Sequence, residues 1–228
     1  TGSALPTDED HDRGFGGAAV MGARFGSAGV MPLAWTYLAT LTDADLRRAT
    51  LTALAHASYL SQALADVFPT LYTHRGHVAH ECVLDLRALT AATGVTAEDV
   101  AKRLIDYGFH APTLSFPVAG TLMVESEPLA ELDRFIAAMR SIRAEIDEVA
   151  SGAVALEDSV LRRSPHTLAA VTAEPWQRPY SRATAAFPLA GMETDKYFPP
   201  VSRVDNAWGD RHLMCTCPPP DAFEAHEA

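Results

Sequence analysis

Residues 96–125, TAEDVAKRLIDYGFHAPTLSFPVAGTLMVE, indicate the fold class because they join a capped helix to a hairpin. Thr96 and Asp99 have the spacing of a capping box, in which each side chain bonds the backbone N–H of the other residue. Gly108 stands where a left-handed residue commonly ends a helix. The pattern therefore predicts a helix over residues 97–107.

Strands are expected on both sides of this helix. The runs 114–116 and 121–125 flank a spacer that contains proline and glycine, which predicts a hairpin. Upstream, residues 71–86 hold two extended runs around Arg75 and Gly76, and the second run alternates roughly between polar and apolar residues. The sequence therefore predicts four short strands.

Two long amphipathic segments surround the expected strands. Thr42 and Asp45 are typical of a helix start, and an apolar stripe continues from there until Pro69. Pro128 opens a second helical segment, in which apolar residues share one face as far as Ile146. The order strand, helix, hairpin, helix predicts an α+β domain with helices on one face of a small, mainly antiparallel sheet.

Composition divides the chain into three predicted parts. Residues 1–30 are a glycine-rich loop segment, residues 31–152 form the α+β domain, and residues 153–228 form an arm rich in proline and aromatic residues. Long helices do not persist among so many prolines. Disordered tails avoid aromatic residues, so we expect the arm to lie extended on a partner surface and to bury its rings there.

The overall composition is that of a soluble globular protein. Of the 228 residues, 48% are hydrophobic and 21% are charged, and no apolar run approaches the ~18 residues of a membrane span. The net charge of −11 makes nucleic acid an unfavourable partner. Three cysteines are too few for a disulfide framework, so a reducing, cytoplasmic location fits best.

Several local patterns offer candidate sites, each with a structural alternative. Gly26 and Ser27 precede a helix and could present amides and a hydroxyl to a phosphate, although a loop packed on the helix is the alternative. His110 lies between a helix stop and the hairpin, where it could carry a proton or position a carboxylate. For His110 the alternative is a structural histidine. Arg203 is a further candidate, and its alternative is a surface turn held by ion pairs.

Two further patterns suggest metal or redox chemistry. His74, His77 and His80 resemble zinc ligands, but a spacing of three in an extended chain places them on alternating faces. Cys215 and Cys217 place two thiols on one side of an extended chain, without a second pair to complete a tetrahedral zinc site. We therefore expect no metal site, and redox sensitivity is the better interpretation of the cysteines.

The chain resembles the glycine decarboxylase family, the P protein of the glycine cleavage system, over roughly residues 25–220. The motifs that carry the resemblance are DYGFHAPTLSFPVAGTLMVE (106–125), AHE (79–81), AELDRF (130–135), SPHTL (164–168), RPYSR (178–182), RVDN (203–206), GDR (209–211) and CTCPP (215–219). Residues 1–24 match the family poorly, and the loop after Glu125 is shorter than is usual in it.

The resemblance implies a pyridoxal 5'-phosphate (PLP) enzyme of the aspartate-aminotransferase fold, type I, of which this chain is the C-terminal part. The small domain then forms one wall of the cleft, with Gly26 and Ser27 near the cofactor phosphate and His110 and Arg203 as candidates for the cleft. The family's aldimine lysine lies before the matched region. We do not expect Lys102 or Lys196 to replace it, so the chain alone is expected to be inactive.

The resemblance also implies the reaction and the partners. The parent protein releases CO₂ from glycine and passes the aminomethyl group to the lipoyl arm of the H protein. Expected partners are therefore glycine, the lipoylated H protein and the N-terminal portion of the P protein, in a homodimer or heterotetramer. Oxidation of Cys215 and Cys217 is expected to modulate access to the cleft. A relative that lost catalysis and serves as a structural or H-protein-docking module is the alternative.

Overall fold

The computed structural model describes residues 27–125 and 127–213 of the chain. It has two compact units, which divide between Thr50 and Leu51. The described part of the first unit holds η2 (Ala28–Val30), α2 (Met31–Ala39) and the beginning of α3 (Asp43–Leu64). Within the described ranges, no helix combines the length and the apolar character that a membrane crossing needs.

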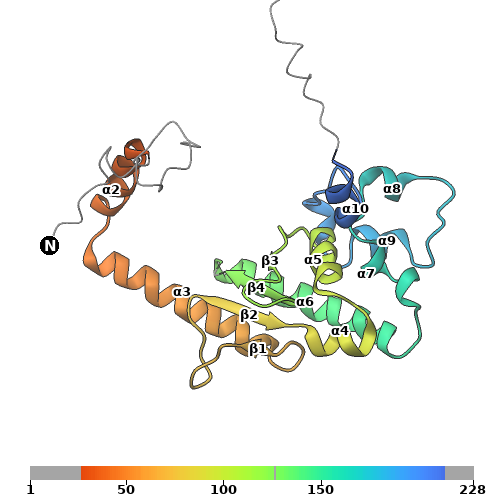
Figure 1. The fold of residues 1–228 in the computed structure, drawn as a ribbon, viewed down its shortest axis with the longest axis horizontal. Helices are drawn as coiled ribbons and strands as arrows, with labels where there is room; N and C mark the ends of the chain where they lie inside the picture. Colours follow the sequence, from red (N-terminus) through yellow and green to blue (C-terminus); the bar gives the residue numbers. More distant parts are fainter. Residues whose placement is uncertain (1–26, 126, 214–228) are drawn as a thin grey trace, which may run out of the picture. The chain divides into compact units, whose positions relative to one another are not determined.

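The second unit is built on a four-stranded antiparallel sheet, as predicted, and its strand order is β1-β2-β4-β3 (Figure 1). The strands are β1 (Thr70–Leu71), β2 (Glu81–Asp85), β3 (Thr113–Leu114) and β4 (Thr121–Glu125). The central pair β2 and β4 is in register along its whole length, and β3 pairs with β4 as the predicted hairpin.

The outer strands are shorter than the sequence pattern indicates. We expected one strand at residues 114–116, but the chain leaves β3 after Leu114 because Ser115 adopts a φ of 56°. Tyr72, with a φ of 59°, ends β1 in the same way. Positive φ values turn an L-residue out of the extended conformation, and apolar periodicity carries no signal of such a turn.

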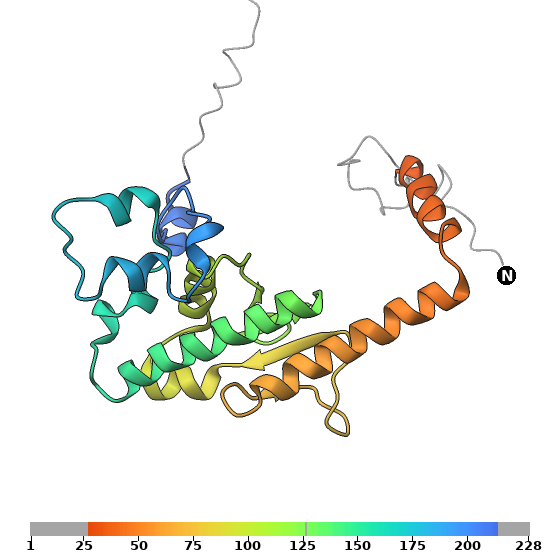
Figure 2. The same ribbon diagram turned by 180° about the vertical axis from the view of Figure 1, so that it is seen from behind.

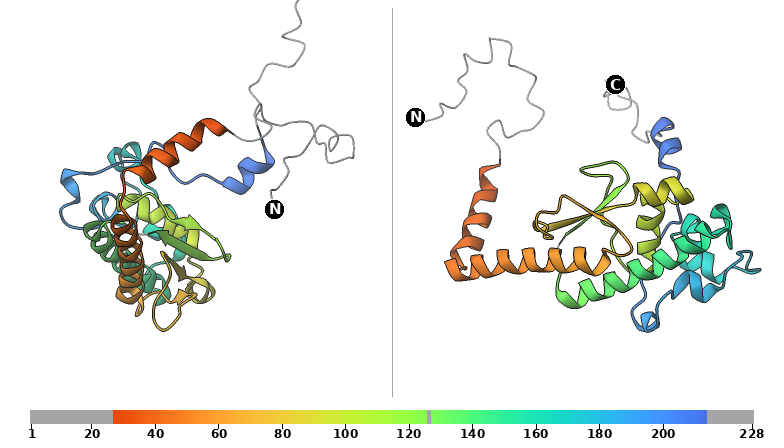
Figure 3. Two further views of the ribbon diagram at one scale, coloured as in Figure 1. Left: turned by 90° about the vertical axis from the view of Figure 1, so that its left-hand side faces the viewer. Right: turned by 90° about the horizontal axis from the view of Figure 1, so that it is seen from below.

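The long helices cover one face of the sheet, as Figures 2 and 3 show for α3 and for α6 (Leu129–Ala150). Alternate residues of the central strands point at these helices, so Cys82 and Leu84 are fully buried beside Leu122. The fully buried helix residues that complete this core include Leu60, Leu64, Val100, Leu104, Met139 and Ile142. The predicted α+β class with an antiparallel sheet is confirmed.

Helix α5 (Ala97–Asp106) begins where predicted and ends one residue before the predicted end. The Thr96 hydroxyl accepts a hydrogen bond from the Asp99 backbone N–H at 3.2 Å, and the Thr96 backbone N–H donates to the Asp99 carboxylate at 2.8 Å. Gly108 then takes a φ of 80°, which lets the chain leave the helix. Helix α4 (Arg87–Thr93) precedes α5 and ends at another left-handed glycine, Gly94.

Replacing Thr96 by alanine is expected to lower the free energy of unfolding by about 1 kcal/mol, because one amide of the first turn of α5 loses its acceptor. Urea unfolding measures this change. Thr172→Ala is the control, since the hydroxyl of Thr172 is exposed and bonds only carbonyls of its own helix. An unchanged urea midpoint for Thr96→Ala would contradict the capping role.

The described part of the predicted arm, residues 153–213, is folded rather than extended, so that prediction is wrong. It contains η3 (Leu156–Asp158), α7 (Val160–Arg163), α8 (Leu168–Thr172), α9 (Arg182–Ala186), η4 (Met192–Thr194) and α10 (Asn206–Arg211). Leu161 and Ala185 are fully buried within this chain, whereas the rings of Tyr197 and Trp208 are exposed. Buried polar groups of α5 hydrogen-bond this segment: Arg103 donates to the Ala185 carbonyl, and Asp106 accepts from Ser164 and His166. The bounds of the three predicted parts and the type I fold stay predictions.

Candidate functional site

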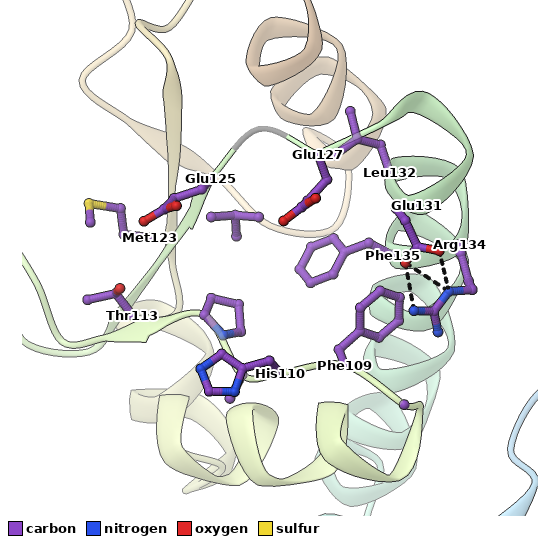
Figure 4. A pocket seen from close by; sticks show the side chains of 14 residues that line it. Phe109, His110, Thr113, Met123, Glu125, Glu127, Glu131, Leu132, Arg134 and Phe135 are labelled. Atoms are coloured by element: carbon purple, nitrogen blue, oxygen red, sulfur yellow. Dashed lines mark hydrogen bonds and ion pairs between the residues drawn. The ribbon is translucent and has the colours of Figure 1, made fainter. Parts of the chain in front are cut away.

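A cavity of about 470 Å³ opens where the loop after α5, the end of β4 and the beginning of α6 meet (Figure 4). The loop contributes Phe109 and His110, and β3 contributes Thr113. Glu125 lies at the end of β4, and Glu127 lies shortly before α6. His110, which the sequence singled out, therefore lines a cavity together with three carboxylates, those of Glu125, Glu127 and Glu131.

Backbone geometry places His110 at this cavity. The N–H of Phe109 donates to the Leu104 carbonyl at 3.0 Å, across the left-handed turn at Gly108. The chain then has four residues, 109–112, before β3 begins at Thr113. His110 is consequently held between the end of α5, which packs in the domain core, and the start of β3, which pairs with β4.

Arg134 fixes this loop from the side of α6. Its guanidinium donates to Glu131 at 2.7 Å and to the Tyr107 carbonyl at 3.0 Å. It also lies 3.7 Å from the centroid of the Phe109 ring, which packs edge-on against Phe135 at 5.4 Å. Arg134 and Glu131 together form a clamp on the loop. The hydrogen bond from Arg134 lowers the pKa of the Glu131 carboxyl, so both residues of the clamp are ionised at neutral pH.

The lining combines an apolar floor with polar groups at the rim. Val124, Leu132 and Phe135 are buried, whereas His110 and the carboxylates of Glu125 and Glu127 are exposed. Such a cavity suits a small ligand that has an apolar part and a group able to hydrogen-bond or to exchange a proton. Among the described residues that line it there is no lysine and no cysteine.

The phosphate and redox candidates from the sequence lie elsewhere in the chain. Ser27 belongs to the first compact unit and directly precedes η2, and its carbonyl accepts a hydrogen bond from the Val30 N–H at 3.1 Å. The Ser27 hydroxyl makes no capping hydrogen bond. Gly26, Cys215 and Cys217 lie outside the described residues. The roles predicted for these four residues therefore stay predictions.

Arg203 does not share the cavity of His110. It lines a separate hollow of about 720 Å³ together with Arg162, and both guanidiniums pair with the buried carboxylate of Asp99. Arg203 also donates to the carbonyls of Ser164, at 3.1 Å, and Leu161, at 3.3 Å. The contacts of Arg203 tie the segment before α10 to α5 and α7, and a role for Arg203 in the cleft stays a prediction.

A buried polar network beside α5 was not predicted from the sequence. The guanidinium of Arg103 is fully buried and bonds the carboxylates of Asp106, at 3.0 Å, and Glu145, at 2.6 Å. His166 Nδ1 lies 2.8 Å from the Asp106 carboxylate, and Nε2 lies 2.8 Å from the Tyr180 hydroxyl. Arg103 falls on the buried stripe of its helix, and this charged residue among apolar ones was the available signal.

Charges within the network fix its protonation. Burial raises the pKa of the Asp106 carboxyl, but hydrogen bonds from His166 and the charge of Arg103 outweigh it and leave that pKa below its ordinary value. Burial raises the pKa of Tyr180 to about 12, so its hydroxyl keeps its proton at neutral pH. Tyr180 can therefore donate to His166 Nε2, and His166 Nδ1–H to Asp106.

The two lysines do not reach the cavity of His110. Lys102 lies on α5, and the Lys196 ammonium donates to the backbone carbonyl of Asp106. Burial lowers the pKa of Lys196. Neither residue is among the described residues that line the cavity.

The histidines that suggested a zinc site lie in the loop between β1 and β2. The backbones of His74 and His77 pair across a turn, with N–H to carbonyl distances of 2.8 Å and 3.0 Å, and Arg75 and Gly76 in the turn have positive φ. Over residues 27–125 and 127–213, no three side chains of histidine, cysteine, aspartate or glutamate form a group able to hold a metal ion.

The sequence of the chain matches one family of known proteins. The family described as "Glycine dehydrogenase, C-terminal domain" matches residues 49–166. A protein of Stenotrophomonas maltophilia (strain K279a) named glycine dehydrogenase (decarboxylating) is 55% identical over 212 residues, which are 91% of this chain and 22% of that protein. The proteins of the same name from Variovorax paradoxus (strain S110) and Xylella fastidiosa (strain Temecula1) are 55% and 54% identical, over 93% and 90% of this chain. The chain spans about one fifth of the length of these relatives.

Proposed function

The chain belongs to the glycine dehydrogenase (decarboxylating) family, corresponding to a C-terminal part of its members, and from this we propose that it supplies one wall of a glycine-decarboxylating active site. The parent protein releases CO₂ from glycine and passes the aminomethyl group to the lipoyl arm of the H protein. The observation that carries the proposal is the cavity of His110, which lies within the region that the family matches.

PLP, when bound, supplies an electron sink for the decarboxylation. The residues of this chain do not make a complete site for it, because the described lining of the cavity contains no lysine and the Lys196 ammonium bonds a backbone carbonyl. Ser27, and Gly26 before it, remain candidates for contact with the phosphate, since the Ser27 hydroxyl makes no capping bond. We therefore assign the anchoring lysine to the N-terminal portion of the parent protein.

The contribution of this chain is positioning and proton transfer. His110 is exposed to the cavity, and an imidazole can take up or release a proton near neutral pH. The clamp made by Arg134 and Glu131 holds Phe109, and thereby the loop that carries His110. The apolar floor excludes water from one side of the ligand.

The chain alone is expected to release no CO₂ from carboxyl-labelled glycine when it is given PLP and lipoylated H protein. Borohydride reduction followed by mass spectrometry is expected to find no specific adduct at Lys102 or Lys196. The Stenotrophomonas maltophilia relative serves as the positive control in both assays. A reduced PLP adduct on either lysine, together with glycine turnover, would contradict the proposal.

The role of His110 is testable in a chimera in which this chain replaces the matching region of the Stenotrophomonas maltophilia protein. The chimera is expected to decarboxylate glycine, and His110→Ala is expected to lower kcat at least about 100-fold, the lower end of the range for loss of one acid–base group. His80→Ala is the matched control, because the His80 side chain is 70% exposed and lines none of the described cavities. Equal rates for the two variants would remove His110 from the mechanism.

A further inference from the structure

Helix α2 is apolar on every side, yet none of its nine residues, MPLAWTYLA, is buried. Its large side chains are between 53% and 71% exposed; they are Met31, Leu33, Trp35, Tyr37 and Leu38. The helix has no acidic residue in its first turn and no basic residue in its last. A helix that is hydrophobic all round belongs in the interior of a protein.

The length of α2 leads to the same conclusion. Isolated helices shorter than about 12–15 residues are marginal in water, so most of their stability in proteins comes from packing. Within the described part of its own compact unit, nothing buries a side chain of α2. The stability of the helix must therefore come from polypeptide that covers it.

We propose that α2 is a docking helix, enclosed by the body of the parent protein, meaning the part of the glycine dehydrogenase polypeptide outside the region matched by this chain. The proposal rests on the proposed function, because it takes the parent from the family. The polypeptide that would cover α2 is present in the relatives, since about four fifths of their length lies outside the match.

A second copy of the chain fits α2 less well. Nine residues of helix are about 14 Å long, and a twofold contact between two such helices covers only one side of each. A stable interface buries about 800 Å² on each partner, more than one side of so short a helix offers. Apolar side chains around the whole circumference require enclosure from several directions, which a large protein body provides.

Hydrogen exchange of the backbone amides tests the proposal in two proteins, the 228-residue chain alone and the chimera described above. The amides of residues 31–39 are expected to exchange at least 100-fold more slowly in the chimera. Helix α8 is the internal control, because its Leu168 is 55% exposed and so resembles Leu38 of α2, which is 53% exposed. The amides of α8 are expected to exchange at the same rate in both proteins.

A pair of substitutions adds a second measurement. Leu33→Ser with Leu38→Ser is expected to speed proteolysis of the chimera within residues 31–39 at least tenfold. The urea midpoint of the chain alone should not change, because neither side chain is buried there. Leu168→Ser is the control substitution on α8 and is expected to leave proteolysis of α2 unaltered.

The outcomes separate the docking proposal from the proposed function. A chimera that turns over glycine while α2 exchanges freely would overturn the docking proposal and leave the function standing. A chimera without activity in which α2 is protected would support docking and count against the function. Protection of α2 in the chain alone that rises with protein concentration would identify a second copy as the occupant and overturn the proposal.

Discussion

Replacing Arg103 by methionine is expected to destabilise the domain by about 3–5 kcal/mol, the cost of removing one member of a buried charge pair. Methionine fills much of the same volume, so the loss comes from the guanidinium and not from a cavity. The carboxylates of Asp106 and Glu145 lose their shared cation. The carbonyls of Thr184 and Ala185 also lose a donor, and the Ala185 contact is buried.

Urea unfolding of the chain, followed by circular dichroism, measures this loss. Arg140→Met is the matched control, because Arg140 on α6 pairs with Asp66 where both side chains are exposed, and it is expected to leave the urea midpoint unchanged. If Arg103→Met unfolds at the same urea concentration as the unaltered chain, the network does not hold the segment after residue 153 onto α5.

The regular elements of the second unit could be predicted because their signals are local. The box of Thr96 and Asp99 and the left-handed Gly108 fix both ends of α5 from residues close in sequence. Pro128 marks the beginning of α6, whose apolar stripe faces the sheet. Capping and periodicity act over a few residues, so their effect does not depend on the rest of the fold.

The candidate site could be predicted only in part. His110 was found because a helix stop, aromatic rings and a hairpin meet around it, and the structure places it in a cavity. The network of Arg103 was missed because its members are far apart in sequence; Glu145 lies 42 residues from Arg103. Residues 153–213 contact that network through hydrogen bonds to Arg103 and Asp106, which composition does not reveal, and their composition therefore suggested an extended arm.

Replacing Asp106 by asparagine is expected to lower the free energy of unfolding by about 3–5 kcal/mol at pH 7. The pH dependence of this loss tests its cause. The carboxylate accepts hydrogen bonds from Arg103, Ser164 and both the backbone N–H and the ring of His166. The NH₂ group of asparagine would face N–H or O–H donors of these neighbours, so at least one contact becomes repulsive. The folded state lowers the pKa of Asp106, although burial alone would raise it.

The pH dependence follows from the direction of that shift. A carboxyl whose pKa is lower in the folded than in the unfolded chain, where it is about 3.9, stabilises the fold fully above the unfolded value. This stabilisation is lost as the pH falls from about 4 through the folded pKa. Asparagine does not titrate, so the difference in unfolding free energy between the two chains should be constant from pH 7 to about 5 and shrink below 4.

Asp147→Asn, at an exposed pair with Arg143, is the control and should show no such change. A difference that stays constant down to pH 2 would mean that Asp106 is not held ionised by its neighbours, and the network would then owe its strength to packing alone.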